Sequence, residues 1–591
     1  MPEPADYTPL TAEELEQQVL TEPAFESLKV DLLPDDLPPP RELLAAALAE
    51  SGVAAPPAEA WEVDPVHESL PDSYFLVPPE AAEVAVEDAW SLTYALQRQG
   101  GVVDAEPLFD TVLDVADQPS QEGADDEDDG DGDVEAMFAA AAAGDGDCAP
   151  VPVDESDHDW SPKLVNAPAA WAIEPPAGGA RRGRGIRIGH PDSGFVTHRE
   201  LFDADEEGQS RVLAHLGHDF VDDDPDPQGP DGSHGLGTAS VAMSFDAARP
   251  DENFVHGVAP EAEIVPFRVA KRWWLTPVLV FGGMRRLAKS IYRAVDAPAS
   301  CHVISISLGF LRNKAVRQAV DHAFENDVIV VAAAGNGVRF VVWPARYPEV
   351  IAVAGCTAGR RKWKGSSRGK SVDVTAPARR VWRAQPQPAN AVEQGDGTSF
   401  ATPTTAGLAA LWLAFWNRDA LLARYAGEFK LTTVFRRVLR DSCDPPPPNA
   451  NGEFGAGIVN ACRLLRTPLP TVEELRASDA HVVEAMAMGA AAPVAGGGLD
   501  AVAEALDRTT AEVRAPLAAM TSVEPARLPQ ELHGVGDELA FHILTNPELR
   551  SRMVAPDDDE IGAAGAASAE AMRAAIDVSR MSPRLRTRLN L

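Results

Sequence analysis

From about residue 185 to residue 465, short and mainly apolar runs alternate with longer stretches of helix-forming residues. Strands that are apolar at nearly every position are buried on both faces, and such strands separated by helices are typical of a parallel sheet. The pattern predicts an α/β body at residues 160–466, with a mostly parallel central sheet and helices on both faces. The runs that carry this prediction are residues 186–188, 303–307, 328–334 and 350–354.

The chain before this body begins without that alternation. Residues 1–69 are rich in Pro, Glu and Ala, and we expect a leader that contains short helices. One helix would follow Thr11, because Thr11 and Glu14 match the capping-box pattern. Residues 41–50 are helix-prone, so the sequence predicts a second helix there.

Residues 70–115 have the mixed pattern of a small folded unit. Residues 74–77 and 102–105 predict strands, because each is a short run of apolar and strand-forming residues. Residues 86–99 repeat apolar side chains at helical spacing. The sequence therefore predicts a strand–helix–strand unit here.

Residues 116–159 form the predicted linker to the body. Within them, residues 121–135 carry nine carboxylates and no cation, and such a block is normally a solvated linker. After the body, residues 471–591 are Ala-rich and predict a helical extension, which opens with the capping-box pair Thr471 and Glu474. We expect this extension either to pack onto the body or to bind a partner protein.

The overall charge excludes several classes of binding partner. The 591-residue chain has 51 Lys and Arg against 91 Asp and Glu, which gives a formal net charge of −40. Binding to nucleic acid or to an anionic membrane depends on surplus cations. We therefore expect no nucleic-acid partner and no membrane partner.

The cysteines and the first residues bear on where the protein works. Five widely spaced cysteines do not form a disulfide framework. Cys443 and Cys462 could pair, but buried or reduced thiols are the favoured interpretation. The residues after Met1 are acidic, unlike a secretory signal, and the apolar stretch 406–416 is too short to cross a membrane. We expect a cytoplasmic protein, or one that is exported by a route that the sequence does not reveal.

Four polar residues of the body follow a predicted strand or lie where a predicted helix begins. Taken singly, each has a structural interpretation as a turn residue, a packed His or a helix N-cap. Ligands of parallel sheets bind at the carboxyl ends of the strands, which gives the four a shared functional interpretation. They are Asp192, His234, Asn336 and Ser399.

Three of these residues together meet the requirements of nucleophilic catalysis. A Ser nucleophile needs a His that accepts its proton, and that His needs a carboxylate that fixes its tautomer. The order along the chain is Asp192, His234, Ser399, which is one of the three orders known for serine triads.

The motifs around these residues resemble those of the subtilases, the subtilisin-like serine proteases. The resemblance covers roughly residues 160–465. Residues 192–194 and 397–403 are similar to the family's Asp and Ser motifs, residues 305–309 to its substrate-binding strand, and residues 333–336 to its oxyanion segment. Two further segments that fit the family are residues 257–260 and 455–461.

The resemblance implies a catalytic role for each residue. Ser399 would attack the scissile carbonyl, and His234 would act first as the general base and then as the acid to the leaving amine. Asp192 would orient His234 and stabilise its cation. Asn336 would donate its side-chain amide to the oxyanion, beside the backbone N–H of Ser399.

The resemblance also implies a substrate-binding edge. One segment would pair with the substrate backbone as an added strand, which makes binding tolerant of substrate sequence. The second segment would form a wall of the cleft. The substrate-binding residues implied are Ser307, Leu308 and Gly309 in the first segment, and Ala333, Ala334 and Gly335 in the second.

This chain departs from the family around its histidines. The usual His-Gly-Thr-His motif is replaced by His-Gly-Leu-Gly-Thr at residues 234–238. The His-Gly core is kept, so His234 is preferred as the base. The histidines set aside are His190, His198, His215 and His218. His190-Pro191 replaces the usual apolar pair before the Asp, and Thr404 stands where the family often has His.

Subtilases commonly carry an amino-terminal prodomain that covers the active site, and residues 70–110 resemble half of such a unit. Residues 268–293 hold seven cations and no acid, and residues 360–383 hold nine cations and one acid. One hypothesis places the acidic block 121–135 against these basic segments in an uncut zymogen. The alternative is that all of them are solvated faces.

No cofactor is required for the chemistry that the resemblance implies. Several subtilases bind Ca²⁺ for stability, and residues 222–226 and 125–133 are acidic. Neither segment has the ordered ligand spacing of an EF-hand loop, so solvated loops are the favoured interpretation and no metal ligand is assigned.

The sequence thus indicates a serine endopeptidase that is made as a self-processing proenzyme. Its partners would be a protein or peptide substrate and its own prodomain. The alternative from another class is a catalytically inactive subtilase-fold module that binds a peptide or a partner. A third interpretation is an esterase that uses the same site.

Overall fold

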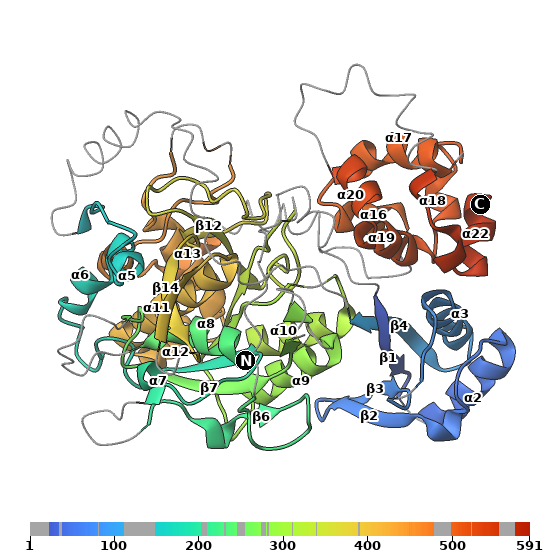
Figure 1. Ribbon diagram of the computed structural model, residues 1–591, viewed down its shortest axis with the longest axis horizontal. Coiled ribbons are helices and arrows are strands. Elements are labelled where there is room, and N and C mark those ends of the chain that lie inside the picture. The colour runs from blue at the N-terminus through green and yellow to red at the C-terminus, as the bar shows by residue number, and fades with distance from the viewer. Residues whose placement is uncertain are drawn as a thin grey trace, which may run out of the picture.

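In the computed structural model the chain forms three parts: an N-terminal unit (residues 24–110), a body (148–466) and a group of C-terminal helices (499–589) (Figure 1). The capping box predicted at Thr11 and the acidic block 121–135 lie outside the described residues. These are 23–34, 38–80, 82–110, 148–202, 210–229, 232–244, 255–272, 279–280, 283–309, 311–337, 340–387, 391–447, 450, 452–477, 498–521, 523–554 and 574–591.

A seven-stranded sheet of order β13-β12-β11-β10-β5-β7-β6 forms the centre of the body, and every neighbouring pair in it is parallel. This confirms the predicted mostly parallel sheet, and the four apolar runs lie on its strands. The strands are β5 (Arg187–Asp192), β6 (His218–Asp219), β7 (Glu263–Arg268), β10 (Val303–Ile306), β11 (Ile329–Ala333), β12 (Val350–Cys356) and β13 (Val374–Pro377).

Helices cover both faces of this sheet. Successive residues of a strand point to opposite faces, so neighbouring residues belong to two different cores. Val303 and Ile329 belong to a core shared with α8, α11 and α13. Their neighbours Ile304 and Val330 belong to a second core shared with α9 and α10. The helices are α8 (Ser233–Met243), α11 (Thr398–Trp416) and α13 (Leu431–Asp441) on the first face, and α9 (Met284–Val295) and α10 (Lys314–Glu325) on the second.

Shorter elements complete the body. Two are antiparallel hairpins, formed by β8 (Lys271–Arg272) with β9 (Leu279–Val280) and by β14 (Val381–Gln385) with β15 (Ala391–Gly395). The others are helical: α5 (Trp160–Leu164), α6 (Ala167–Trp171), α7 (Arg199–Phe202), η3 (Ala214–Leu216), α12 (Arg418–Tyr425) and α14 (Ala461–Arg466).

The N-terminal unit is an antiparallel sheet of order β2-β3-β1-β4 with two helices, in the βαββαβ order of ferredoxin-like folds. β3, α3 and β4 match the elements predicted between residues 74 and 105, and α2 matches the helix predicted at 41–50. Its elements are β1 (Ala24–Leu32), α2 (Pro40–Ser51), η1 (Ala58–Ala60), β2 (Glu62–His67), β3 (Leu70–Val77), α3 (Val86–Gln97) and β4 (Val102–Asp110).

The predicted boundary at residue 70 differs from this architecture. β1 and β2 lie in the range 1–69, which we expected to be a leader, yet both pair with β3 in one sheet. β2 and β3 are consecutive strands that pair directly, whereas α2 and β2 separate β1 from β3, and a local pattern does not reveal pairing at that distance. The folded unit therefore spans residues 24–110.

One face of the N-terminal sheet packs against the body. The other face encloses its own core with α2 and α3, which includes Leu28, Leu44 and Leu92. On the docked face, Phe75 and Phe109 share a core with residues of α9 and α10. Figure 1 shows β1 to β4 beside α9, so the N-terminal unit lies on the outer helices of the second sheet face.

Carboxylates of the N-terminal unit meet the N-termini of α9 and α10. Glu106 Oε1 accepts from the backbone N–H of Lys314 at 2.6 Å and of Ala315 at 3.2 Å. Asp110 Oδ1 accepts from Gly283 N at 2.5 Å, and Glu26 Oε2 accepts from Arg285 N at 3.4 Å. The first N–H groups of a helix have no partner within the helix, so these hydrogen bonds from the N-terminal unit satisfy them and contribute to docking.

The basic segment 268–293 also meets carboxylates of the N-terminal unit. Asp64 on β2 pairs with Arg285 Nη1 at 2.7 Å and with Lys289 Nζ at 2.6 Å. Because block 121–135 lies outside the described residues, its proposed contact with the basic segments stays a prediction.

The C-terminal helices contact both the N-terminal unit and the body. Phe541 lies 4.5 Å from Phe109, measured between ring centroids, and Tyr94 Oη donates to Glu538 Oε2 at 2.9 Å. On the side of the body, Arg346 pairs with Asp507 at 3.1 Å. The helices are α16 (Leu499–Ala505), α17 (Thr510–Thr521), α18 (Leu528–Glu531), α19 (Gly536–Thr545), α20 (Pro547–Val554), η4 (Val578–Arg580) and α22 (Pro583–Leu589).

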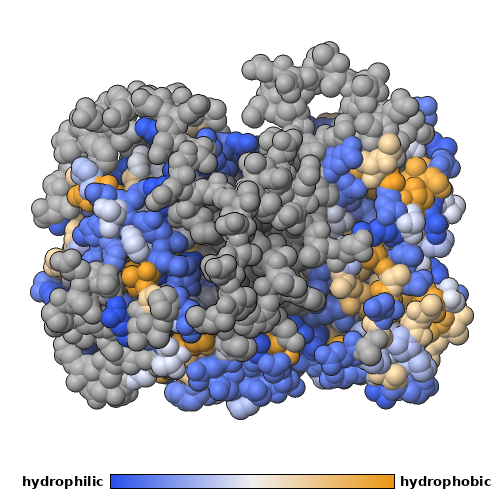
Figure 2. All heavy atoms as spheres, viewed as in Figure 1, coloured by the Kyte–Doolittle hydropathy of each residue, from blue (hydrophilic) through white to orange (hydrophobic). Residues whose placement is uncertain are grey.

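These contacts agree with the expected helical extension and with its packing onto the rest of the chain. The capping box that opens it is formed: Thr471 N donates to Glu474 Oε2 at 2.7 Å, and Glu474 N donates to Thr471 Oγ1 at 3.1 Å. In Figure 2 the hydrophobic part of the described surface gathers mainly over the N-terminal unit and the C-terminal helices. In the part of the chain that the structure describes, no helix has the length and hydropathy that crossing a bilayer requires.

A disulfide joins Cys148 to Cys462, with the two Cα atoms 5.3 Å apart. This corrects the interpretation of buried or reduced thiols for these two cysteines, and it excludes the Cys443–Cys462 pair. Cys301 and Cys356 are buried free thiols, as that interpretation expects. Cys443 is a free thiol that donates to the Leu439 carbonyl at 3.3 Å. The bonded residues are 314 positions apart, so their proximity comes from the tertiary fold.

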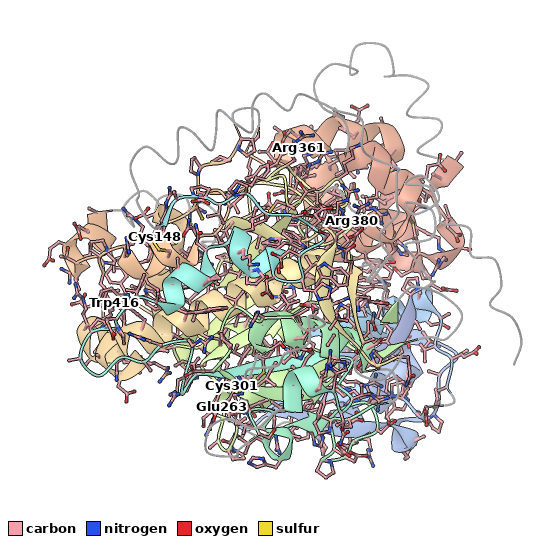
Figure 3. All side chains as sticks on the ribbon, turned by 60° about the vertical axis from the view of Figure 1, so that its left-hand side comes forward. Cys148, Glu263, Cys301, Arg361, Arg380 and Trp416 are labelled. Carbon is pink, nitrogen blue, oxygen red and sulfur yellow. A yellow bond between two sulfur atoms is a disulfide. The ribbon has the colours of Figure 1, made fainter. Side chains whose placement is uncertain are left out.

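The disulfide holds Cys148, which Figure 3 labels, against the body. The side-chain amides of Asn166 and Asn460 both donate to the Cys148 carbonyl, at 3.2 Å and 3.0 Å. Trp160 is fully buried, and its indole N–H donates to the Arg380 carbonyl at 2.8 Å. The body therefore includes residues from Cys148 onward, twelve positions before the predicted residue 160.

Replacing both Cys148 and Cys462 by Ser is expected to lower the free energy of unfolding by about 2–4 kcal/mol, because the crosslink restricts the unfolded chain. Urea unfolding followed by Trp fluorescence measures the change. Cys443→Ser is the matched control and should cost less. If the double variant and the wild type unfold at the same urea concentration under oxidising conditions, the crosslink does not stabilise the protein.

Candidate active site

The four candidate residues are buried and come from four separate elements. Asp192 is the last residue of β5, Asn336 follows β11, and His234 and Ser399 lie in the first turns of α8 and α11. β5 and β11 both lie beside β10 in the sheet, so their carboxyl ends are close together. The relative exposure of these residues is 3 % or less.

The Asp192 carboxylate binds the imidazole of His234. Their Oδ1 and Nδ1 atoms lie 2.7 Å apart, although the residues are 42 positions apart in the sequence. Because a carboxylate only accepts, Nδ1 carries the proton and Nε2 is the basic nitrogen. Ser193 N donates to the same Oδ1 at 2.6 Å, and Thr238 Oγ1 donates to Oδ2 at 3.3 Å.

These contacts keep Asp192 ionised. Burial alone would raise the pKa of its carboxyl group, but the charge of His234 and the hydrogen bond from it act in the opposite direction. His190 and the Ser193 N–H add to this effect, and the pKa of Asp192 is lowered below its usual value. A permanent negative charge beside His234 favours the protonated imidazole that forms during proton transfer.

Gly235 lets the helix of His234 approach the strand of Asp192. A Cβ at position 235 would lie 1.9 Å from the Gly194 carbonyl oxygen and 3.3 Å from Asp192 Cβ. Because a methyl group does not fit at that distance, the His-Gly pair is a geometric requirement of this site. The part of the family motif that this chain keeps is thus the part that the close packing needs.

Ser399 lies in the first turn of α11, which packs against α8. Its hydroxyl donates to the Ser307 carbonyl at 3.4 Å, and the Ser307 hydroxyl donates to the Ser399 carbonyl at 2.9 Å. These bonds tie the start of α11 to the residue that follows β10. The helix N-terminus also favours negative charge that develops near Ser399.

The side chain of Asn336 is oriented by Thr398. Asn336 Oδ1 accepts from the backbone N–H and from the hydroxyl of Thr398, both at 2.8 Å. A Cβ at Gly397 would lie 3.5 Å from both Asn336 Nδ2 and Ser399 Cβ. The amide nitrogen and the Ser399 side chain therefore flank the same point, and Gly397 leaves that point open.

The two segments expected to bind substrate lie close together. A Cβ at Gly309 would lie 2.5 Å from Val342 Cγ2, and a Cβ at Gly335 would lie 3.0 Å from Val342 Cγ1. Leu308 and Ala334 are fully buried, so these two segments offer backbone rather than large side chains to a ligand. Ser307 and Ala333 are buried as well.

Of the histidines considered, the structure brings His234 and His190 to Asp192. His190 Nε2 lies 2.9 Å from Thr238 Oγ1 and 3.9 Å from Asp192 Oδ2. Burial lowers the pKa of His190 more than Asp192 raises it, which favours the neutral imidazole. The others lie elsewhere: His198 binds the Ala391 carbonyl, His218 pairs with Asp223, and His215 is exposed.

Sequence reasoning missed three supporting residues. Thr238 contacts Asp192, Thr398 orients Asn336, and the Ser193 hydroxyl accepts from Gly235 N at 3.1 Å. Thr238 had a detectable signal, because it follows His234 by four positions and shares its helix face. Thr398 and Ser193 are neighbours of Ser399 and Asp192, but sequence does not show where their side chains bond.

The acidic segment 222–226 carries no cation-binding arrangement among its described contacts. Asp222 instead pairs with Arg268 Nη1 at 2.5 Å, and Asp219 pairs with the same atom at 2.5 Å. The positive charge of the Arg268 guanidinium thus compensates these two carboxylates in the way that a bound metal ion would.

Comparisons with known proteins agree with this arrangement. A family model described as the subtilase family matches residues 183–457. Thermitase of Thermoactinomyces vulgaris is 34% identical over 276 residues, which cover 46% of this chain and 88% of thermitase. Subtilisin BL of Lederbergia lenta is 32% identical over 257 residues (43% and 82%), and an intracellular serine protease of Paenibacillus polymyxa is 31% identical over 258 residues (42% and 71%). The chain therefore belongs to the subtilase family and is a subtilisin-like serine protease.

Proposed function

We propose that this subtilase is an endopeptidase in which Ser399 is the nucleophile, His234 the general base and Asp192 the group that orients the base. The observation that carries the proposal is the buried 2.7 Å hydrogen bond between His234 Nδ1 and Asp192 Oδ1. This bond joins β5 to α8, and α8 packs against α11. Ser399 lies in the first turn of α11.

The reaction begins when the Ser399 hydroxyl turns from the Ser307 carbonyl toward His234 Nε2. Ser399 Oγ then bonds to the scissile carbonyl carbon while its proton passes to Nε2. The oxyanion accepts from the side-chain amide of Asn336 and from the backbone N–H of Ser399. Breaking the C–N bond leaves an acyl-enzyme, and His234 returns the proton to the departing amine.

Water then repeats the sequence on the acyl-enzyme. It gives a proton to His234 and attacks the ester carbonyl, and His234 returns the proton to Ser399 as the acid product leaves. Residues 307–309 and 333–335 would hold the substrate by its backbone, because their side chains are small or buried. This mode of binding suits protein substrates of varied sequence.

The N-terminal unit is proposed to be the prodomain of this enzyme. It packs on α9 and α10 through Glu26, Glu106 and Asp110, the last of which is the final residue of β4. A self-cleavage between residues 111 and 147 would release the unit. A cut beyond Cys148 would leave the unit joined to the body by the disulfide, so we place the cut before that residue.

The compartment is a separate proposal. The Cys148–Cys462 disulfide ties residue 148 to the body. Structural disulfides persist in oxidising environments and are rare in the cytoplasm. This disulfide therefore favours export over the cytoplasmic location expected from the sequence.

The intact masses of the wild type and of Ser399→Ala test the proposed activity. We expect a cut within residues 111–147 in the wild type and an uncut chain in the variant. A fluorophosphonate probe should label the processed wild type and not the variant. Absence of labelling after the N-terminal unit is removed would support the binding module instead, and turnover of esters without turnover of peptides would support the esterase.

A further inference from the structure

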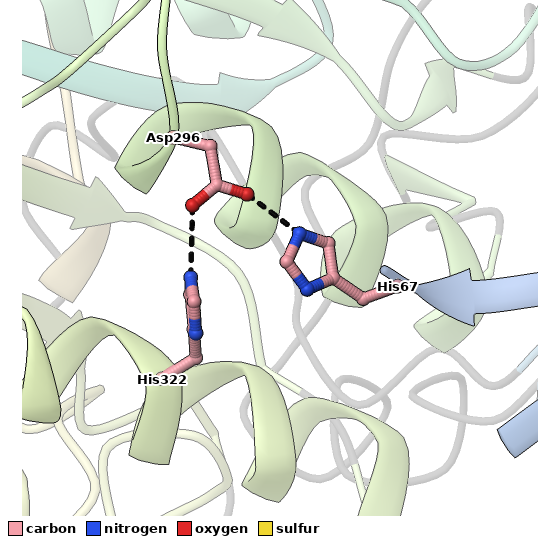
Figure 4. Close-up of side chains that lie close together, drawn as sticks. All are labelled: His67, Asp296 and His322. Atoms are coloured by element: carbon pink, nitrogen blue, oxygen red, sulfur yellow. Dashed lines mark hydrogen bonds and ion pairs between the residues drawn. The ribbon is translucent and has the colours of Figure 1, made fainter. Parts of the chain in front are cut away.

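Three potential metal ligands meet at the junction of the N-terminal unit and the body. His67 is the last residue of β2, Asp296 follows α9, and His322 lies on α10. His67 Nε2 lies 2.6 Å from Asp296 Oδ2, and His322 Nε2 lies 2.9 Å from Asp296 Oδ1 (Figure 4). The ligand atoms of the three residues all lie within 4.8 Å of one another.

The surroundings hold the His67 ring with Nε2 toward Asp296. The ring stacks on Tyr292 of α9, with centroids 4.2 Å apart and planes 8° apart. On its other nitrogen, Nδ1 lies 2.7 Å from Ser69 Oγ. A partner on Nδ1 is what fixes the tautomer and the orientation of a metal-ligating histidine.

The cluster is open enough to admit an ion. The side chains of His67 and His322 are 13% and 19% exposed, and that of Asp296 is 34% exposed. The most exposed ligand is therefore the short carboxylate between the two rings. A small rotation of Asp296 would let one of its oxygens and both Nε2 atoms approach a common point, while solvent supplies a fourth ligand.

The donor set selects the class of ion. Two imidazole nitrogens and one carboxylate oxygen suit zinc and similar divalent transition ions, which they bind at about 2.0–2.2 Å. Calcium and magnesium prefer oxygen ligands alone. For Nε2 to bind an ion, His67 must carry its proton on Nδ1, where Ser69 Oγ lies 2.7 Å away and can accept it. The Ser69 backbone N–H, which lies 3.2 Å from Nδ1, then has to give up its hydrogen bond to that nitrogen.

We propose that His67, Asp296 and His322 form a zinc-class metal site that joins the N-terminal unit to the body. Two ligands belong to the body and one to the N-terminal unit, so the complete site exists only while the unit is docked. Ion binding therefore stabilises docking by mass action. The metal site does not depend on the proposed function. Its effect on release of the prodomain does rest on that function.

Titration of the uncut Ser399→Ala chain, without a histidine tag, tests the site. Zn²⁺ followed by calorimetry should bind with one ion per chain, and Co²⁺ should give the visible absorption of a four-coordinate site. His67→Gln, His322→Gln and Asp296→Asn, each in the same chain, should each weaken binding by at least about a hundredfold. His215→Gln, which changes an exposed histidine outside the cluster, should bind as the parent does.

Thermal unfolding of the same proteins separates loss of the site from loss of folding. Zn²⁺ should raise the midpoint of the parent and of His215→Gln, and should leave the three cluster variants unchanged. The proposal fails if no ion binds, or if His67→Gln and His322→Gln bind one Zn²⁺ as tightly as the parent. Three hydrogen-bonded side chains without a metal would then be the correct description. Because no arm needs catalysis, failure here leaves the proposed function untouched.

Discussion

Replacing Asp192 by Asn is expected to slow peptide hydrolysis by about four orders of magnitude, the loss known for the corresponding change in another serine protease. The asparagine side chain would present a neutral amide to His234 in place of a charged acceptor. The amide can donate to Nδ1, which would move the imidazole proton to Nε2 and remove the base that Ser399 needs. The loss of charge also removes the stabilisation of the imidazolium.

The rate is best measured on chains that have been cut within residues 111–147 by a second protease, so that failure of self-processing does not enter the comparison. Turnover of a denatured protein substrate gives the rate. Asp226→Asn, a change of an exposed carboxylate, is the matched control and should leave the rate unchanged. Activity of Asp192→Asn within tenfold of the wild type would contradict the role proposed for Asp192.

The body and the candidate site could both be predicted from the sequence for the same reason. Strands buried on both faces are apolar at nearly every position, so β11 and β12 are visible as runs, and the residue that follows such a strand is placed at the edge of the sheet. Asn336 follows β11 and is a residue of this kind, and Asp192 is the last residue of β5, whose end lies at the same edge. His234 and Ser399 lie in helix first turns.

Contacts between segments that are distant in the sequence could not be predicted from local patterns. Cys148 and Cys462 meet because the chain before α5 lies against α14, and nothing near either cysteine indicates this. β1 was missed for a similar reason, since its partners are β3 and β4. The His67 cluster was missed for the same reason, because its residues lie in two units and neither histidine has a motif around it in the sequence.

Docking of the N-terminal unit places two carboxylates in buried positions, and this makes the docked state sensitive to pH. Burial raises the pKa of Glu106 to about 7, against the attraction of Lys314 and Lys29. Burial and the neighbouring Asp110 raise the pKa of Glu26 to about 7, against the attraction of Arg285 and Arg286. Both groups have a value of 4.5 when exposed.

Stability of the uncut chain is therefore expected to fall as pH rises from about 4.5 through about 7. A carboxyl group whose pKa is raised by folding binds more protons in the folded chain than in the unfolded chain across that range, so its contribution is complete below 4.5 and is lost above about 7. A rise from 4.5 to about 7 corresponds to a contribution on the order of a few kcal/mol for each group.

The double variant Glu26→Gln/Glu106→Gln isolates this effect, because glutamine keeps the shape of the protonated side chain and does not ionise. Urea unfolding of Ser399→Ala with and without the two changes, from pH 5 to pH 8, gives the difference in the free energy of unfolding. The parent should lose stability relative to the double variant as pH rises, and Glu59→Gln, a change of an exposed carboxylate, should follow the parent. A parent that instead gains stability relative to the double variant would mean that the ionised carboxylates hold the helix N-termini more strongly than burial opposes them. Release of the N-terminal unit would then be favoured by acid rather than by neutral pH.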